Sequence, residues 1–273
     1  MKPIITASIV IYNNDRDALL KAIRSVLAAK ELQTLYLVDN SDSDVFRNIS
    51  KDKRVVYCHN KRNLGFGKAH NIAIRAALEG GSKFHFVVNP DIFFSKEVLR
   101  PMVNLMQNDE EIGLMMPRVL NNDGTVQFLP KLPPSPFYMI WRKIRIPKKA
   151  FNKFINLYEI RNAPPDQIYI APRVSGCFSL LNLEVIKELG MYDERFFMYF
   201  EDSDLSRRIY QKYKTVYYPA VSVYHAYENG AGKSLKLFVL FVHSAIKYFN
   251  KWGWFFDKER KEINVRTMEQ FDF

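Results

Sequence analysis

Residues 84–91 read Phe84-His85-Phe86-Val87-Val88-Asn89-Pro90-Asp91, an apolar run that ends abruptly in an amide, a proline and a carboxylate. An unbroken apolar run of this length is typical of a strand that is buried on both faces of a parallel sheet. Asn-Pro-Asp is good turn chemistry, so the simplest interpretation of the last three residues is a turn. The functional alternative is a strand-end site in which Asp91 helps to hold a divalent cation.

Short apolar runs alternate with helical patterns on both sides of this stretch. The predicted strands cover 4–11, 35–38, 54–58 and 84–88, and the predicted helices cover 15–29 and 68–78. This alternation predicts βαβ units and an α/β fold with a mostly parallel central sheet. Ligands of such sheets bind beyond the carboxyl ends of the strands. Asp39, the loop 60–67 and Asn89–Asp91 follow three of these strands, so we expect them to meet at one edge.

The second half of the chain has a different pattern. Residues 129–136 contain four prolines, and residues 141–153 are rich in lysine and arginine. We expect this basic segment to be mobile or to lie on the surface, and not to join the sheet. Further on, the patterns predict strands at 173–181 and 215–224, helices at 183–189 and 202–213, and an aromatic, basic amphipathic helix at 234–254.

Composition limits the classes of function. With 273 residues, of which 48% are hydrophobic, the chain can bury a sizeable core. Its 40 Lys and Arg against 29 Asp and Glu give a net charge of +11, which suggests an anionic partner. No apolar stretch is long enough to predict a membrane span, and the first residues lack the pattern of a signal peptide. Cys58 and Cys177 lie in apolar surroundings, so we expect reduced core thiols in a cytoplasmic protein and no nucleophile.

A second acidic signature, Glu201-Asp202-Ser203-Asp204, follows the aromatic run 196–200. Asp202 stands where it can cap the predicted helix 202–213, which would be a purely structural role. The functional alternative is a general base, because burial among aromatic rings raises the pKa of a carboxyl towards a useful range. Asp204 is the rival of Asp202 for either role.

Two further segments have both a structural and a functional interpretation. His225 follows the predicted strand 215–224 and precedes a glycine-containing loop, 227–233. A lone histidine at this place is more often a packing residue than a ligand, but one imidazole with one carboxylate suits Mg²⁺ or Mn²⁺ held by a diphosphate. The stretch 62–67 contains two glycines and opens the helix 68–78. It is either an ordinary turn or a place where the backbone approaches an anion closely.

In their order and spacing these segments resemble the inverting family 2 glycosyltransferases of the GT-A fold. They are most similar to the bacterial rhamnosyltransferases of O-antigen, capsule and cell-wall polysaccharide synthesis. The matching stretches are 8–14, 38–41, 63–67 with Asn71, 88–91, 174–178, 192–205 and 217–225. The resemblance implies a Rossmann-like central sheet flanked by helices, followed by a C-terminal amphipathic helical extension.

The resemblance also implies a role for each matching residue. Those that would line or border the nucleotide-sugar donor are Tyr12, Asn13, Asp39, Arg62, Asn63, Asn71 and Asn89. Asp91 and His225 would bind a divalent metal, Mg²⁺ or Mn²⁺. Asn89 stands where the family's Asp-x-Asp motif has its first aspartate, which leaves open whether the metal is strictly required. Asp202 would be the general base, with Glu201 beside it in the catalytic site.

The implied reaction transfers a sugar with inversion onto a saccharide acceptor that is linked to a lipid diphosphate. Rhamnose from dTDP-rhamnose is the first expectation, and a UDP-hexose or UDP-N-acetylhexosamine is the alternative donor. A non-catalytic, membrane-associated partner subunit of the same fold is the other alternative. A nucleotidyltransferase would need a glycine-rich basic loop where Tyr12-Asn13-Asn14-Asp15 stands. The basic residues cluster away from any nucleic-acid reader motif, so we expect no nucleic acid partner.

We expect residues 1–232 to form a catalytic domain and residues 233–273 to form a helical tail. Within that domain, 1–120 would bind the nucleotide sugar and 121–232 the acceptor, with the basic mobile segment at 129–165. The aromatic face and interleaved lysines of the tail suit an anionic membrane surface, here the inner face of the cell membrane. The alternative is that this helix packs on the catalytic domain or on a second copy in a homodimer.

Overall fold

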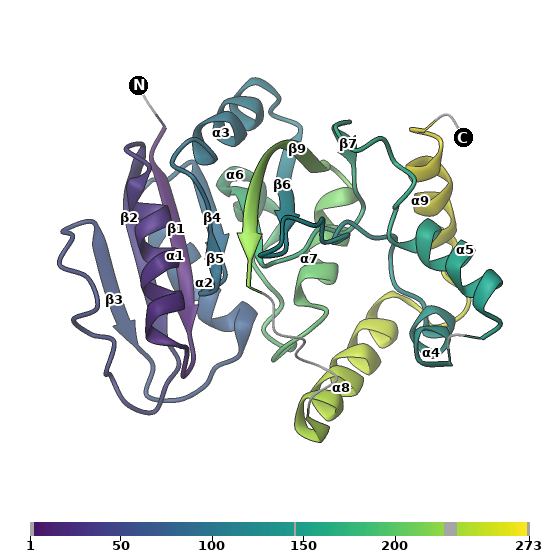
Figure 1. Cartoon of the computed structure of the whole chain (residues 1–273), viewed down its shortest axis with the longest axis horizontal. Coiled ribbons are helices and arrows are strands. Elements are labelled where there is room, and N and C mark those ends of the chain that lie inside the picture. Colours follow the sequence, from purple (N-terminus) through teal and green to yellow (C-terminus); the bar gives the residue numbers. More distant parts are fainter. Residues whose placement is uncertain (1–2, 145, 227–233, 272–273) are drawn as a thin grey trace.

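The computed structural model describes residues 3–144, 146–226 and 234–271 (Figure 1). Within them lies one sheet of nine strands, in which the order β3-β2-β1-β4-β8-β6-β9-β5 is extended by β7 on β9. The strands are β1 (Ile5–Ile11), β2 (Leu32–Asp39), β3 (Val55–His59), β4 (Phe84–Val88), β5 (Ile92–Phe93), β6 (Ile112–Leu120), β7 (Tyr169–Ile170), β8 (Phe178–Asn182) and β9 (Lys214–His225). The helices are α1 (Arg16–Ala28), α2 (Phe66–Glu79), α3 (Leu99–Asn108), α4 (Pro136–Ile144), α5 (Lys148–Tyr158), α6 (Leu183–Leu189), α7 (Glu201–Tyr210), α8 (Leu235–Trp252) and α9 (Lys258–Met268).

The predicted α/β fold with a central sheet flanked by helices is confirmed (Figure 1). The first four strands, β1 to β4, pair in parallel, as expected. The second half of the sheet is mixed, because β8 runs antiparallel to both β4 and β6 while β6 and β9 are parallel. A strand buried on both faces is an apolar run whichever way it pairs, so the sequence could not show this reversal.

The reversal of β8 brings an additional segment to the edge where β1, β2 and β4 end. The backbone nitrogen of Asn89, just after β4, donates to the carbonyl oxygen of Cys177, just before β8, over 2.8 Å. Ile92 of β5 pairs with His225, the last residue of β9. The loop after β4, the start of β8 and the end of β9 therefore all lie at one edge of the sheet.

The basic segment expected at 129–165 contains two helices, α4 and α5, and adds no strand to the sheet among the described residues. Their aromatic side chains pack together, with the rings of Trp141 and Phe154 stacked at 4.7 Å between centroids. Helix α4 begins at Pro136, which is tolerated in a first helical turn because no helical hydrogen bond is lost there. Only Pro136 of the four prolines enters a helix, and Pro130, Pro133 and Pro134 lie in irregular structure before it.

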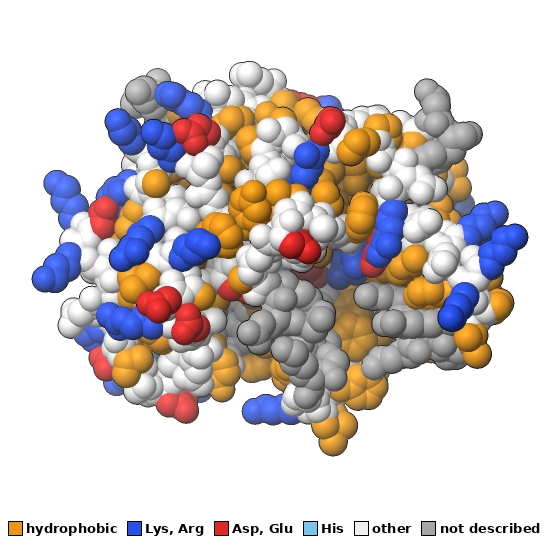
Figure 2. All heavy atoms as spheres, in the orientation of Figure 1, with side chains coloured by type: hydrophobic (Ala, Val, Ile, Leu, Met, Phe, Trp, Pro, Cys, Tyr) orange, Lys and Arg blue, Asp and Glu red, His pale blue; other side chains and the backbone are white. Residues whose placement is uncertain are grey.

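The tail forms α8, close to its predicted bounds, and a further helix, α9, which the sequence analysis did not identify. The described part of the chain has no helix long and apolar enough to cross a membrane. On the face drawn in Figure 2, lysine and arginine side chains are spread over the side formed by α1, β2 and β3 and over α5. They do not gather into one basic stripe on that face.

Candidate active site

The ends of β1, β2 and β3 are joined by short hydrogen bonds. The nitrogen of Asn40 donates to the carbonyl of Ile11 over 2.8 Å, and that of Asn60 donates to the carbonyl of Asp39 over 2.8 Å. Beyond β1 the chain turns sharply, since Asn13 has a left-handed backbone with φ 51°. Its nitrogen is fixed by the hydroxyl of Ser41 at 3.0 Å. Tyr12 is left 44% exposed beside this turn.

Asp39 is fully buried at the end of β2. Its Oδ1 accepts a hydrogen bond from the nitrogen of Ser41 at 2.8 Å, and its Oδ2 accepts one from the hydroxyl of Tyr57 at 2.6 Å. Burial and the neighbouring Asp39 raise the pKa of Tyr57, so this hydroxyl keeps its proton. Any contact of Asp39 with a nucleotide therefore requires the surrounding side chains to shift. Tyr57 was not identified from the sequence, because nothing in its own strand marks it.

The loop before α2 is shaped by its own amides. Asn63 Oδ1 accepts from the nitrogen of Gly65 at 2.9 Å and from Nδ2 of Asn40 at 3.3 Å. Arg62 is exposed beside it. Asn71, by contrast, is buried and uses its amide within the protein, donating to the carbonyl of Tyr192 at 2.8 Å and accepting from its nitrogen at 3.1 Å. The structure therefore places Asn71 against the segment before α7 and away from the strand ends.

Asp202 lies in the first turn of α7 and does not cap it, since the helix begins after Phe200 without a side-chain cap. Its Oδ1 accepts from the nitrogen and the hydroxyl of Ser203 at 2.6 and 3.1 Å. The Arg173 guanidinium lies 3.9 Å from the same oxygen. A negative charge is favoured at this end of a helix. Arg173 precedes β8 and was not identified from the sequence, since only folding brings it to α7.

Asp202 and Asp91 both lie near the segment that carries Cys177, since Gly176 adjoins Asp202 and the carbonyl of Cys177 accepts from the nitrogen of Asn89. Burial raises the pKa of Cys177 to about 12, and the charges of Asp91 and Asp202 both add to this effect. The thiol is therefore protonated at neutral pH, in agreement with the expectation that it is no nucleophile. A Cβ placed on the adjacent Gly176 would lie 3.6 Å from the Cβ of Asp202, so this segment passes directly beside the carboxylate.

Glu201 is buried behind Asp202, with 7% of its surface exposed. Burial, with a contribution from the charge of Asp202, raises the pKa of Glu201 to about 8. Its Oε2 atom has no hydrogen-bond partner among the described residues. At neutral pH Glu201 is thus mostly protonated, whereas a general base has to be ionised.

Asp204, the other candidate base, uses its carboxylate to bind side chains of α7 and α8. It is fully buried, and its Oδ2 accepts from Nε of Arg208 at 2.9 Å. Its Oδ1 accepts from Nε1 of Trp252 at 2.8 Å and lies 2.6 Å from Nζ of Lys251. Asp204 therefore ties α7 to α8, and Asp202 is the carboxylate left at the edge of the sheet.

Asp91 and His225 meet where β5 pairs with the end of β9. Oδ1 of Asp91 lies 3.3 Å from Nε2 of His225, whose side chain is 5% exposed. That carboxylate oxygen is buried and accepts no hydrogen bond from the described residues. Two ligands of one octahedral cation, each about 2.1 Å away, lie about 3 Å apart, so this pair fits a divalent cation. No group of three or more His, Cys, Asp or Glu suited to a metal occurs in the described ranges, and the predicted loop 227–233 lies outside them.

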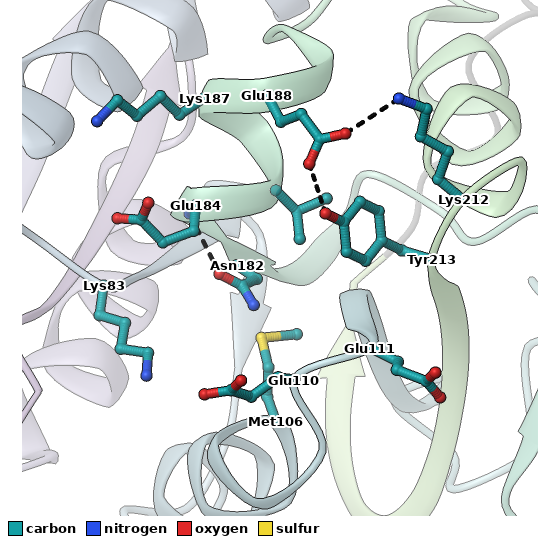
Figure 3. Close-up of a pocket in the computed structure, with 11 residues that line it drawn as sticks. Lys83, Met106, Glu110, Glu111, Asn182, Glu184, Lys187, Glu188, Lys212 and Tyr213 are labelled. Atoms are coloured by element: carbon teal, nitrogen blue, oxygen red, sulfur yellow. Dashed lines mark hydrogen bonds and ion pairs between the residues drawn. The ribbon is translucent and has the colours of Figure 1, made fainter.

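A large cleft of about 860 Å³ opens at the opposite edge of the sheet (Figure 3). It contains none of the predicted site residues. Lys83, Glu110, Glu111, Asn182, Glu184, Lys187, Glu188, Lys212 and Tyr213 are among its lining side chains. In Figure 3, Glu188 points towards Lys212 and Tyr213, and it accepts from their Nζ and hydroxyl at 3.1 and 2.5 Å. Because its charges are of both signs and partly paired, this cleft does not resemble a diphosphate site.

The sequence is similar to those of known glycosyltransferases. The model of a family described as "Glycosyl transferase family 2" matches residues 6–190. A low-salt glycan biosynthesis hexosyltransferase of Haloferax volcanii is 26% identical over 202 residues, 74% of this chain and 60% of that protein. An N-acetylglucosaminyl-diphospho-decaprenol L-rhamnosyltransferase of Mycobacterium tuberculosis is 24% identical over 76% of this chain and 71% of its own length.

The fold is that of the GT-A glycosyltransferases. A crystal structure of GalNAc-T7 with UDP, GalNAc and Mn²⁺ superposes with a TM-score of 0.68 at 18% sequence identity. The match covers 95% of this chain but only 49% of that one, so the chain spans about half of the longer protein. The resemblance noted in the sequence is therefore confirmed at the level of fold and family, and the chain belongs to glycosyl transferase family 2.

Proposed function

We propose that this protein transfers a sugar, with inversion, from a nucleoside diphosphate sugar onto a saccharide acceptor in the synthesis of a glycan or surface polysaccharide. The observation that carries the proposal is that Asp202 and the Asp91–His225 pair lie on either side of residues 176 and 177 at one edge of the sheet. A Cβ on Gly176 would lie 3.6 Å from that of Asp202, and the carbonyl of Cys177 accepts from the nitrogen of Asn89, two residues before Asp91. Asp91 faces an imidazole, a pairing that suits a divalent cation, and Asp202 lies in the first turn of α7 beside Arg173. Asp91 and His225 thus suit the cation that binds a diphosphate, and Asp202 suits the removal of a proton.

For the donor, we propose residues 1–120 as the binding half. Tyr12, Asn13, Asp39, Arg62, Asn63 and Asn89 are its proposed contacts, and Asn71 supports the neighbouring segment from behind. Rhamnose from dTDP-rhamnose is our first choice, supported by the similarity to a rhamnosyltransferase. A UDP-sugar is the alternative, since the similar GalNAc-T7 was crystallised with UDP.

For the metal, we propose that Asp91 and His225 hold one Mg²⁺ or Mn²⁺, with diphosphate oxygens completing its coordination. When bound, the cation supplies positive charge that stabilises the leaving nucleoside diphosphate. Two protein ligands suffice, because Mg²⁺ in nucleotide sites is usually held by one or two carboxylates and the phosphates. The buried Oδ1 of Asp91, which accepts no hydrogen bond from the described residues, supports this assignment.

For the proton, we propose Asp202 as the general base that receives it from the acceptor hydroxyl. The oxygen of that hydroxyl attacks the anomeric carbon on the side opposite the diphosphate, and the bond to the diphosphate breaks in the same step. Arg173, whose Nη2 lies 3.9 Å from Oδ1 of Asp202, places a positive charge beside this carboxylate. Glu201 is our proposed supporting residue, whose neutral carboxyl avoids a second negative charge beside the base.

For the acceptor, we propose residues 121–232 as the binding half and a lipid-diphosphate-linked saccharide as the substrate. The relative from Mycobacterium tuberculosis is named for such a lipid, N-acetylglucosaminyl-diphospho-decaprenol. We further propose that the tail rests on the inner face of the cell membrane. Its contact would be the exposed apolar side chains in the first half of α8, such as Leu235 at 79% and Val239 at 57% exposure.

The lysines of α8 do not all face the proposed membrane. Lys247 donates to the carbonyl of Arg195 at 2.5 Å, and Lys251 lies 3.1 Å from Asp193. Ser244, Ala245, Tyr248 and Phe249 are buried, and the last three pack with Phe196 and Phe200 of the segment before α7. One face of the second half of α8 therefore packs on the domain, as the alternative interpretation expected. The most exposed apolar side chains of the helix, Leu235 and Val239, lie in its first half.

Calorimetric titration with dTDP, UDP and GDP, each with and without Mn²⁺ or Mg²⁺, tests the proposal. We expect one nucleotide to bind in a metal-dependent way, and Asp91→Asn to weaken that binding. Glu188→Gln, in the opposite cleft, is the control and should bind like the wild type. Absence of binding to all three nucleotides would contradict the proposal and favour the non-catalytic partner subunit.

A further inference from the structure

Behind His225 lies a short turn that the proposed reaction does not use. After β6 the chain turns through residues 121–125, with Gly124 in a left-handed backbone at φ 83°, and pairs back on itself between Leu120 and Val126. The nitrogen of Gln127 donates to the carbonyl of Val119 at 2.8 Å. Since Leu120 pairs with Tyr224 in the sheet, this turn brings the Gln127 side chain beside His225.

Asp123 determines which group donates and which accepts in each hydrogen bond of this turn. Oδ1 of Asp123 can only accept, so the hydroxyl of Thr125 donates to it at 2.6 Å. That hydroxyl then accepts from Nδ2 of Asn121 at 2.8 Å. Because Nδ2 of Asn121 faces Thr125, Oδ1 of the same amide faces Gln127. This oxygen accepts from Nε2 of Gln127 at 2.7 Å.

A backbone hydrogen bond independently determines which end of the Gln127 amide is the nitrogen and which is the oxygen. Its Nε2 also donates to the carbonyl oxygen of His225 at 3.1 Å, and a carbonyl cannot donate. Oε1 of Gln127 therefore points to the ring, 3.2 Å from Nδ1 of His225. An amide oxygen can only accept, so Nδ1 of His225 carries a proton.

The proton on Nδ1 determines the state of Nε2, the other nitrogen of the His225 ring. In the neutral imidazole a proton on Nδ1 leaves a lone pair on Nε2, and this atom lies 3.3 Å from the buried Oδ1 of Asp91. The opposite tautomer would donate its Nε2 proton towards Asp91 and join the two residues in a hydrogen bond. In the neutral ring the turn thus prevents a hydrogen bond from Nε2 to Asp91, and the two residues present two acceptors to one cation.

We propose that Gln127, oriented by Asn121 and Thr125, is a positioning residue that holds His225 with its proton on Nδ1, so that Nε2 and Asp91 bind the divalent cation together. The inference rests on the proposed function for the cation, whereas the tautomer stands on the hydrogen bonds alone. Such partners of metal-ligating histidines fix the ring and raise its basicity.

Nitrogen-15 NMR of the metal-free protein, with labelled histidine, tests the tautomer directly. We expect the His225 resonances, assigned by their loss in His225→Asn, to show a protonated Nδ1 and an unprotonated Nε2. Gln127→Met should shift them towards the other tautomer, and Thr125→Val should do so less. A wild-type ring with its proton on Nε2 would overturn the inference.

Mn²⁺ affinity in the presence of the nucleotide that binds, measured by electron paramagnetic resonance, tests the cation. We expect about a 10- to 100-fold loss in Gln127→Met, as for other partners of metal-bound histidines, and a smaller loss in Thr125→Val. Gln107→Met, on the exposed face of α3, is the matched control and should bind like the wild type. Unchanged affinity in Gln127→Met would overturn the inference alone, whereas a wild type that binds nucleotide but no Mn²⁺ would refute the proposed metal site and the inference with it.

Discussion

The backbone nitrogen of Phe66 donates a hydrogen bond to the carbonyl oxygen of Phe197 over 2.9 Å. This bond joins the loop before α2, with its proposed donor contacts, to the segment before α7, which leads to Asp202. That segment carries two successive left-handed residues, Tyr199 and Phe200, with φ of 69° and 67°. Such conformations cost free energy and persist only where neighbouring contacts hold them. The two halves of the proposed site therefore support each other through one backbone contact.

Gly65→Ala tests this contact. Gly65 has φ 83°, and a Cβ on it would overlap the carbonyl of Phe197. Gly81 also has a left-handed backbone, with φ 72°, but no atom lies within 4 Å of a Cβ placed there. Gly81→Ala should lose about 1 kcal/mol of unfolding free energy for the backbone. Gly65→Ala should lose about 1–3 kcal/mol more in urea unfolding, because its ψ of −178° is a conformation almost restricted to glycine and because of the overlap with Phe197. Equal losses in the two variants would contradict the close approach.

Glu201 should make the stability of the protein depend on pH. Its pKa is raised to about 8 in the folded state, against about 4.3 in an unfolded chain. Between these values the unfolded state has lost a proton that the folded state keeps, so stability falls as the pH rises through this range. The Gln side chain of Glu201→Gln cannot ionise. The stability of this variant relative to the wild type should therefore rise by a few kcal/mol between pH 5 and pH 8. Parallel melting temperatures of the two proteins across this range would show that Glu201 ionises normally.

Arg207 of α7 should anchor the C-terminal helices α8 and α9 to the rest of the protein. It is 2% exposed, donates to both oxygens of Asp257 at 2.7 Å, and lies 4.4 Å from the ring centre of Trp252. Removing one partner of a buried ion pair typically costs 3–5 kcal/mol, and we expect about that loss in urea unfolding of Arg207→Ala. Lys258→Ala, in an exposed pair with Glu262, should change stability by less than about 0.5 kcal/mol. A loss in Arg207→Ala no larger than in this control would refute the anchoring role.

The first half of α8 should bind a lipid surface. We expect Leu235→Ser with Val239→Ser to lower co-sedimentation with anionic vesicles by about 10-fold or more, because each substitution removes exposed apolar surface. Val265→Ser on α9 is the matched control, since Val265 is 56% exposed and Val239 is 57% exposed. Equal binding of all three proteins to the vesicles would place the membrane contact elsewhere or exclude it.

Most of the periodic elements could be predicted from the sequence. Helix α3 was missed, although its buried Leu99, Met102, Val103 and Met106 have helical spacing. Strand β6 was not predicted from the sequence because it contains Gly113 and Pro117, and both residue types usually end a strand. In the fold a Cβ on Gly113 would lie 2.7 Å from Ile209 and 2.8 Å from Val185, so only glycine lets α6 and α7 pack on the strand. Pro117 stands where the register with β9 shifts, a place where a proline costs no regular hydrogen bond.

For the site, the sequence pointed to single residues and the fold supplied their partners. Asp91 and Asp202 stand out beside their apolar and aromatic runs. The choice between Asp202 and Asp204 depended on Trp252 and Lys251, which are distant in sequence. Arg173 and Gln127 carry no local signal, because each becomes significant only through a residue that another strand or helix brings to it.

The central claim is most directly tested by sugar transfer in Asp202→Asn. The measurement uses a radiolabelled sugar donor of the nucleotide class that binds, with N-acetylglucosaminyl-diphospho-polyprenol as acceptor. We predict that the variant binds the nucleotide like the wild type and transfers sugar about 10²- to 10⁴-fold more slowly, as expected for loss of a general base. Transfer by Asp202→Asn at the wild-type rate would contradict the assignment of Asp202 and the mechanism built on it.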